Sequence, residues 1–93
     1  MSVSETNAAD EANPITPEAA DAAVEAALAA FAAAATVADL KQARTEHAGD
    51  GSPIARLNAR MRQVPKDQKA ATGKLMGQAR GRIEAAYQAR ESE

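Results

Sequence analysis

The sequence lacks cysteine and tryptophan, and histidine, phenylalanine and tyrosine occur once each among its 93 residues. Without cysteine the chain has no disulfide framework and no thiol chemistry, and a single histidine excludes a metal site built from several histidines. Two aromatic residues are also too few for a surface that binds single-stranded nucleic acid by stacking bases on aromatic rings.

Long apolar runs are absent as well. The alanine-rich stretch 19–35 carries Asp21 and Glu25 and falls short of the hydrophobicity of a membrane-spanning helix. The residues before it are acidic, whereas a signal peptide begins with a basic segment. A cytoplasmic protein with no membrane contact is therefore expected.

No group of residues suggests catalysis. Glu46, His47 and Asp50 are close in sequence but have no nucleophile or metal ligand beside them. The stretch 49–51 is too short for a phosphate-binding loop and lacks its lysine and hydroxyl residues. We therefore expect no catalytic residue, no metal and no cofactor in this chain, which by itself is not an enzyme.

The charges are divided unevenly along the sequence. Residues 1–40 contain seven acidic residues and no Lys or Arg, whereas residues 41–93 hold all eleven basic residues and six acidic ones. Between residues 53 and 82, eight basic residues accompany a single acidic one, Asp67. A solvated helix face is the simpler explanation for such a segment, but this imbalance equally favours a polyanionic partner such as duplex or folded RNA.

The residues that are present favour helices. Alanine makes up most of the apolar fraction, and it forms helices well but buries little area. Apolar residues recur at spacings of three and four, and no strand pattern is present. Thr16, Thr36 and Ser52 are suited to cap helices, and Pro65 should end one. The sequence thus predicts a disordered acidic tail over 1–15 and helices over about 17–48, 54–64 and 66–90, with a break near Thr36.

These lengths predict an all-α, elongated antiparallel hairpin or coiled-coil arm. Helices 17–48 would be nearly collinear and pair with 66–90, with the short helix at the tip. Gly73, Gly77 and Gly81 would allow the opposite helix to approach closely. The candidate RNA-binding residues are the basic side chains at and next to this tip: Arg56, Arg60, Arg62, Lys66, Lys69 and Lys74.

The order of short motifs over about seventy residues resembles a known family. The matching stretches are residues 38–40, 44–49, 64–69, 71–73, 83–86 and 89–90, with Ile54 and Leu57 between them. In this order they resemble the N-terminal helical arm of the bacterial phenylalanyl-tRNA synthetase alpha subunit. One departure is Asp50-Gly51-Ser52, which stands where the family has a Lys-Lys-Gly turn and puts RNA contacts by that turn in doubt.

The resemblance implies a function for the arm. In this family the arm is a coiled coil that contacts the outer part of tRNA-Phe, and the catalytic domain, with its ATP and magnesium, lies downstream and is absent here. The parent enzyme would be a phenylalanine–tRNA ligase, in which alpha and beta subunits form a heterotetramer. The alternative is a free-standing helical hairpin that binds another protein through its alanine and glycine faces.

Overall fold

The computed structural model describes residues 13–92, and these residues form helices without any strand. In chain order the elements are α2 (Pro17–Ala33), α3 (Val37–Ala48), α4 (Pro53–Asn58), the 3-10 helices η1 (Ala59–Gln63) and η2 (Lys66–Gln68), and α5 (Lys69–Ser92). The predicted all-α class is confirmed. The expected helix 54–64 is α4 followed by η1, and the expected helix 66–90 is η2 followed by α5.

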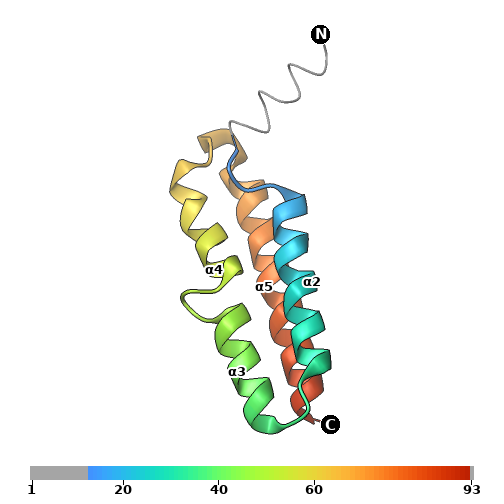
Figure 1. Ribbon diagram of the computed structural model, residues 1–93. Coiled ribbons are helices and arrows are strands. Elements are labelled where there is room, and N and C mark those ends of the chain that lie inside the picture. The colour runs from blue at the N-terminus through green and yellow to red at the C-terminus, as the bar shows by residue number, and fades with distance from the viewer. Residues whose placement is uncertain (1–12, 93) are drawn as a thin grey trace.

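The helices form an elongated bundle of 51 × 23 × 19 Å with three limbs (Figure 1). α2 runs along one limb, α3 and then α4 return along the second, and α5 runs back parallel to α2. The predicted antiparallel hairpin is therefore formed by α3 and α4 with α5, and η1 and η2 make its tip (residues 59–68). The expected collinearity of 17–33 and 37–48 is wrong, because the chain reverses at residues 34–36 and α2 packs against α3, α4 and α5.

Three side-chain hydroxyls start the three helices that precede the tip, as predicted. Each hydroxyl oxygen accepts a hydrogen bond from the backbone N–H three residues later. Thr16 Oγ1 accepts from Ala19 at 3.1 Å, Thr36 Oγ1 from Asp39 at 3.0 Å, and Ser52 Oγ from Ala55 at 3.2 Å. Each bond satisfies a backbone donor that the first helical turn leaves unpaired. Ser52 is fully buried and also donates to the carbonyl oxygen of Gly49 at 2.6 Å, which fixes the loop between α3 and α4.

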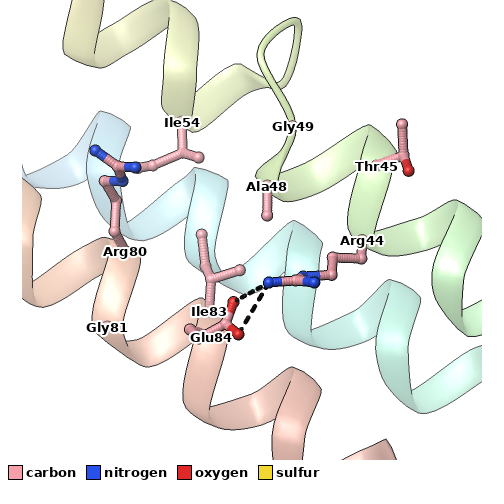
Figure 2. Close-up of a pocket in the computed structure, with 9 residues that line it drawn as sticks. All are labelled: Arg44, Thr45, Ala48, Gly49, Ile54, Arg80, Gly81, Ile83 and Glu84. Carbon is pink, nitrogen blue, oxygen red and sulfur yellow. Dashed lines mark hydrogen bonds and ion pairs between the residues drawn. The ribbon is translucent and has the colours of Figure 1, made fainter.

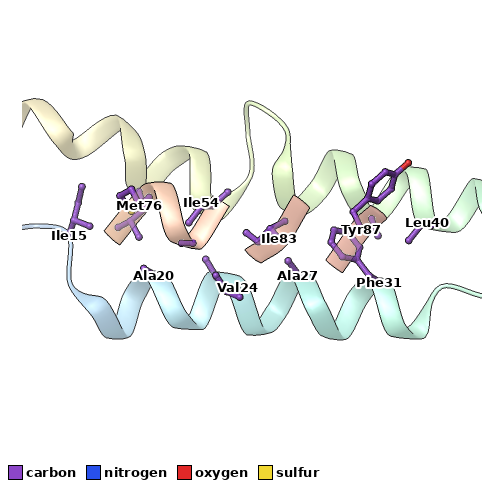
Figure 3. Packing of buried hydrophobic residues seen from close by; sticks show 14 of the residues in the cluster. Ile15, Ala20, Val24, Ala27, Phe31, Leu40, Ile54, Met76, Ile83 and Tyr87 are labelled. Atoms are coloured by element: carbon purple, nitrogen blue, oxygen red, sulfur yellow. The ribbon is translucent and has the colours of Figure 1, made fainter. Parts of the chain in front are cut away.

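The core lies along the axis shared by the three limbs (Figure 3). α2 contributes mainly alanines and two larger side chains, and α5 contributes a seam at the predicted spacing. The buried residues of these two helices are Ala20, Ala23, Val24, Ala27 and Phe31 in α2, and Thr72, Met76, Ala79, Ile83 and Tyr87 in α5. Tyr87 is the last buried residue of this seam, and Val37 at the start of α3 is 67% exposed.

The end of the predicted tail belongs to the core. Residues 1–12 of that tail lie outside the described residues, but Ile15 is only 2% exposed and packs in the hydrophobic cluster. The Asn13 side-chain amide donates to Gln68 Oε1 at 2.8 Å and to Thr72 Oγ1 at 3.1 Å. The prediction of disorder is therefore wrong for residues 13–15, because they connect the start of α2 to η2 and α5 at the tip.

The glycine stripe of α5 does not face a neighbouring helix, which corrects the expectation of close approach. A Cβ atom added to Gly77 or Gly81 would meet no atom within 4 Å, and one on Gly73 would meet only Cε of Met61 at 3.8 Å. A glycine inside a helix costs about 1 kcal/mol relative to alanine. Packing within the described residues therefore does not explain why α5 has glycine at 77 and 81.

The end of the bundle opposite the tip is held by aromatic and charged side chains. The rings of Phe31 and Tyr87 meet edge to face with centroids 5.7 Å apart, and the Arg44 guanidinium lies 4.6 Å from the Tyr87 ring centroid. Arg90 donates from Nε to the carbonyl oxygen of Phe31 and from Nη2 to that of Ala34, at 3.0 and 2.8 Å. These carbonyls belong to the end of α2, where a cation is also favoured by the helix dipole.

Candidate nucleic-acid interface

The six candidate RNA-binding residues lie on consecutive elements at and beside the tip. Arg56 belongs to α4, Arg60 and Arg62 to η1, Lys66 to η2, and Lys69 and Lys74 to the first turns of α5. All six are exposed. Because Pro65 ends one run of helix and the chain turns at the tip, basic residues from two limbs are presented at one end of the molecule (Figure 1). We call these six residues the tip patch.

Within the described residues the tip patch shares with Lys41 and Arg80 a lack of side-chain partners, whereas Arg44, Arg82 and Arg90 have such partners. Within residues 13–92, none of its side chains makes an ion pair or a hydrogen bond. By contrast, Arg82 lies 3.3 Å from Asp21 and 3.9 Å from Glu25 of α2, so acidic residues of α2 balance its charge. Arg44 donates to both carboxylate oxygens of Glu84 at 3.0 Å. The charge of the patch is thus left uncompensated by the fold.

A pocket of about 550 Å³ lies midway along the arm, between the end of α3, the start of α4 and the middle of α5. Ile54 and Ile83 form part of its wall, and both are almost fully buried. Figure 2 shows the Arg80 guanidinium beside Ile54, and the Arg44–Glu84 ion pair on the side toward the far end of α5. In the sequence Arg80 is only one of the eight basic residues between residues 53 and 82, and nothing in its neighbours indicates that it borders a pocket.

The described residues offer no group for metal chemistry. Residues 13–92 contain no cluster of three or more His, Cys, Asp or Glu that could hold a metal ion. Over the same residues, none of the helices combines the length and the apolar character that crossing a membrane requires.

Comparison with known families identifies the kind of domain. The family described as aminoacyl tRNA synthetase class II, N-terminal domain, matches residues 35–93, which include α3, α4 and α5. This match covers the hairpin and its tip patch, and the chain belongs to this family. α2 lies outside the matched residues.

Within this family the chain is similar to phenylalanine–tRNA ligase alpha subunits. The subunit from Leifsonia xyli is 53% identical over 53 residues, which is 57% of this chain and 15% of the relative. The subunit from Thermobifida fusca is 35% identical over 83 residues, 89% of this chain and 22% of the relative, so that this alignment includes α2. The chain thus spans about a fifth or less of the length of these relatives.

Proposed function

We propose that this chain is the tRNA-binding arm of a phenylalanine–tRNA ligase alpha subunit and that its tip patch contacts the phosphate backbone of tRNA-Phe. The observation that carries the proposal is the set of six exposed cations without partners on a hairpin of this family. Basic side chains that the fold leaves uncompensated can neutralise phosphates and release the counterions bound to them.

Such contacts position the RNA but do not read its sequence. Phosphate contacts set orientation and register, whereas sequence is read at the edges of the bases. The patch is therefore suited to the shape of a folded RNA. With no more than six contacts, the arm alone should bind with a non-specific affinity, on the order of 10⁻⁴ to 10⁻⁶ M at physiological salt.

The other parts of the proposal concern the whole enzyme. ATP- and magnesium-dependent attachment of phenylalanine is assigned to the remainder of the alpha subunit, which works in the cytoplasm in a heterotetramer with beta subunits. The arm would add tRNA contacts without taking part in amino-acid activation. In the whole enzyme, loss of the tip patch should therefore raise the KM for tRNA and leave activation of phenylalanine unchanged.

The test is charge reversal with a matched control. Arg60→Glu in η1 and Lys69→Glu in α5, made separately, should each weaken binding of a tRNA-Phe transcript. Each should also lower the slope of log K against log salt by about 0.7 to 0.9, the value of one lost phosphate contact. Because the contacts are with the backbone, a second tRNA of different sequence should be affected equally.

Lys41→Glu is the control, since Lys41 is an exposed residue at the start of α3, at the end of the bundle opposite the tip. It makes the same change in net charge as each tip variant. If Lys41→Glu weakens binding as much as the tip variants do, only net charge matters and the assignment of the tip patch is wrong. Absence of salt-sensitive tRNA binding by the unmodified chain would contradict the proposed function itself.

A further inference from the structure

We infer that the pocket midway along the arm takes one unpaired nucleotide of the bound RNA, with its base inside and its phosphate on Arg80. This inference rests on the proposed function, because it names a contact of the same RNA. It goes beyond backbone contact at the tip, since an unpaired base gives the arm a means to distinguish a folded RNA with extruded nucleotides from a continuous duplex.

The walls of the pocket suit the faces of a base. Ile54 and Ile83 line the pocket with the few apolar atoms that they expose, since both are almost fully buried, and no side chain covers the backbone at Gly81. Protein sites for unstacked RNA bases combine apolar or aromatic surface with guanidinium planes, and Figure 2 shows the guanidinium of Arg80 beside Ile54. The volume of about 550 Å³ also falls within the range of ligand sites of small molecules, roughly 300 to 1,000 Å³.

The charges around the pocket favour a ligand that is anionic at one end and polar at the other. Arg80 has no ion-pair partner within residues 13–92, so it can receive a phosphate. Glu84 is neutralised by Arg44, which donates to both of its oxygens, and Oε1 also accepts from Gln88 Nε2 at 3.4 Å, so Oε2 is the oxygen that can still accept a bond from an N–H on the edge of a base.

The position of the pocket agrees with a strand of RNA that continues from the tip. Lys69 and Lys74 of the tip patch precede Arg80 on α5, so the three cations follow one helix from the tip to the pocket. Ile54, in the first turn of α4, is two residues from Arg56 of the patch. A backbone held at the tip can therefore reach Arg80 along α5, and its next unpaired base can enter beside Ile54.

Gly81 allows a test that does not disturb the fold. A Cβ atom there would meet nothing within 4 Å, and Gly81→Leu replaces a poor helix former with a good one, so the variant should be as stable as the parent or more so. Its side chain would occupy space in the pocket. Gly77→Leu is the matched control, because position 77 is equally open on the same helix but does not line the pocket.

The two variants and the unmodified chain are compared for binding of a tRNA-Phe transcript and of a blunt RNA duplex without unpaired nucleotides. Thermal unfolding by circular dichroism confirms that each is folded. Gly81→Leu should lower affinity for the transcript about tenfold, the effect of losing one stacked base, and leave duplex affinity unchanged. Gly77→Leu should change neither. In NMR spectra of the unmodified chain, the transcript should shift the methyl signals of Ile54 and Ile83 more than those of Ile15, the one other isoleucine of the sequence.

If Gly81→Leu binds the transcript as tightly as the parent chain does, the pocket holds no nucleotide, while the tip patch and the proposed function stand. If the parent chain binds no tRNA, both fail together. If sedimentation shows that the unmodified chain is a dimer and Gly81→Leu a monomer, a second copy of this chain occupies the pocket and the inference is overturned.

Discussion

Replacement of Ile15 by alanine should destabilise the fold strongly, although this residue lies outside the helices, before α2. Its side chain is only 2% exposed and packs in the hydrophobic core. Truncation of a buried Ile to Ala costs about 2 to 5 kcal/mol, since burial is lost and a cavity remains. A chain of this size has a total stability of roughly 4 to 12 kcal/mol, so about 3 kcal/mol would be a large part of it.

The loss would also affect how the tip is held. Ile15 lies two residues after Asn13, whose side-chain amide bonds Gln68 of η2 and Thr72 of α5. The Asn13 side-chain oxygen also accepts from the N–H of Ile15 at 2.9 Å, so Asn13→Ala removes three part-buried hydrogen bonds and should cost about 1 to 3 kcal/mol. Because Lys66 and Lys69 lie close to these acceptors in the sequence, both substitutions should loosen the part of the tip patch that η2 and α5 carry.

The assay is thermal and urea unfolding of the full chain, followed by circular dichroism. Ile15→Ala should lower the Tm by roughly 10 to 20 °C, because each kcal/mol corresponds to about 4 to 8 °C in a domain of this size. Val37→Ala is the control: it also shortens a β-branched apolar residue, but one that is 67% exposed, and should change stability by no more than about 0.5 kcal/mol. Equal effects of the two substitutions would show that Ile15 does not pack in the core.

Two further predictions concern the end opposite the tip. Arg90→Met should lower the free energy of unfolding, measured in urea, by about 2 kcal/mol, because it removes charge-assisted hydrogen bonds to the carbonyls at the end of α2. Arg82→Met is the control: it breaks only exposed ion pairs and should cost less than about 1 kcal/mol. Equal costs of the two substitutions would contradict the capping role of Arg90. Burial and the neighbouring Glu91 carboxylate raise the pKa of Tyr87 above its ordinary value of 10.0. Its contribution to stability is therefore complete below pH 10 and lost as the pH rises through the folded-state pKa, and Tyr87→Phe should remove this dependence. Tyr87 is the only tyrosine, so ultraviolet titration of its phenolate reports its pKa directly, and a folded-state midpoint at or below that of the unfolded chain would refute the assignment.

The starts of the helices could be predicted because capping is local chemistry. Thr16, Thr36 and Ser52 each lie three residues before the N–H that they accept from, so the signal is complete within four residues. Pro65 ends a helical run for an equally local reason, since it lacks a backbone donor. The basic residues of the tip patch were also evident from the sequence, because charged side chains without apolar periodicity remain exposed.

Only the tertiary structure decided how these helices face one another. The reversal at residues 34–36 depends on packing between α2 and three other helices, and a capping residue does not define the angle at which a helix leaves. Val24 and Phe31 mark the buried side of α2 in the sequence, but nothing local specifies which helices cover that side. The same holds for the outward glycines of α5, the buried Ile15 and the pocket beside Arg80, because each depends on contacts between residues far apart in the chain. The sequence by itself determined only features that depend on a few neighbouring residues, such as helix caps and the break at Pro65.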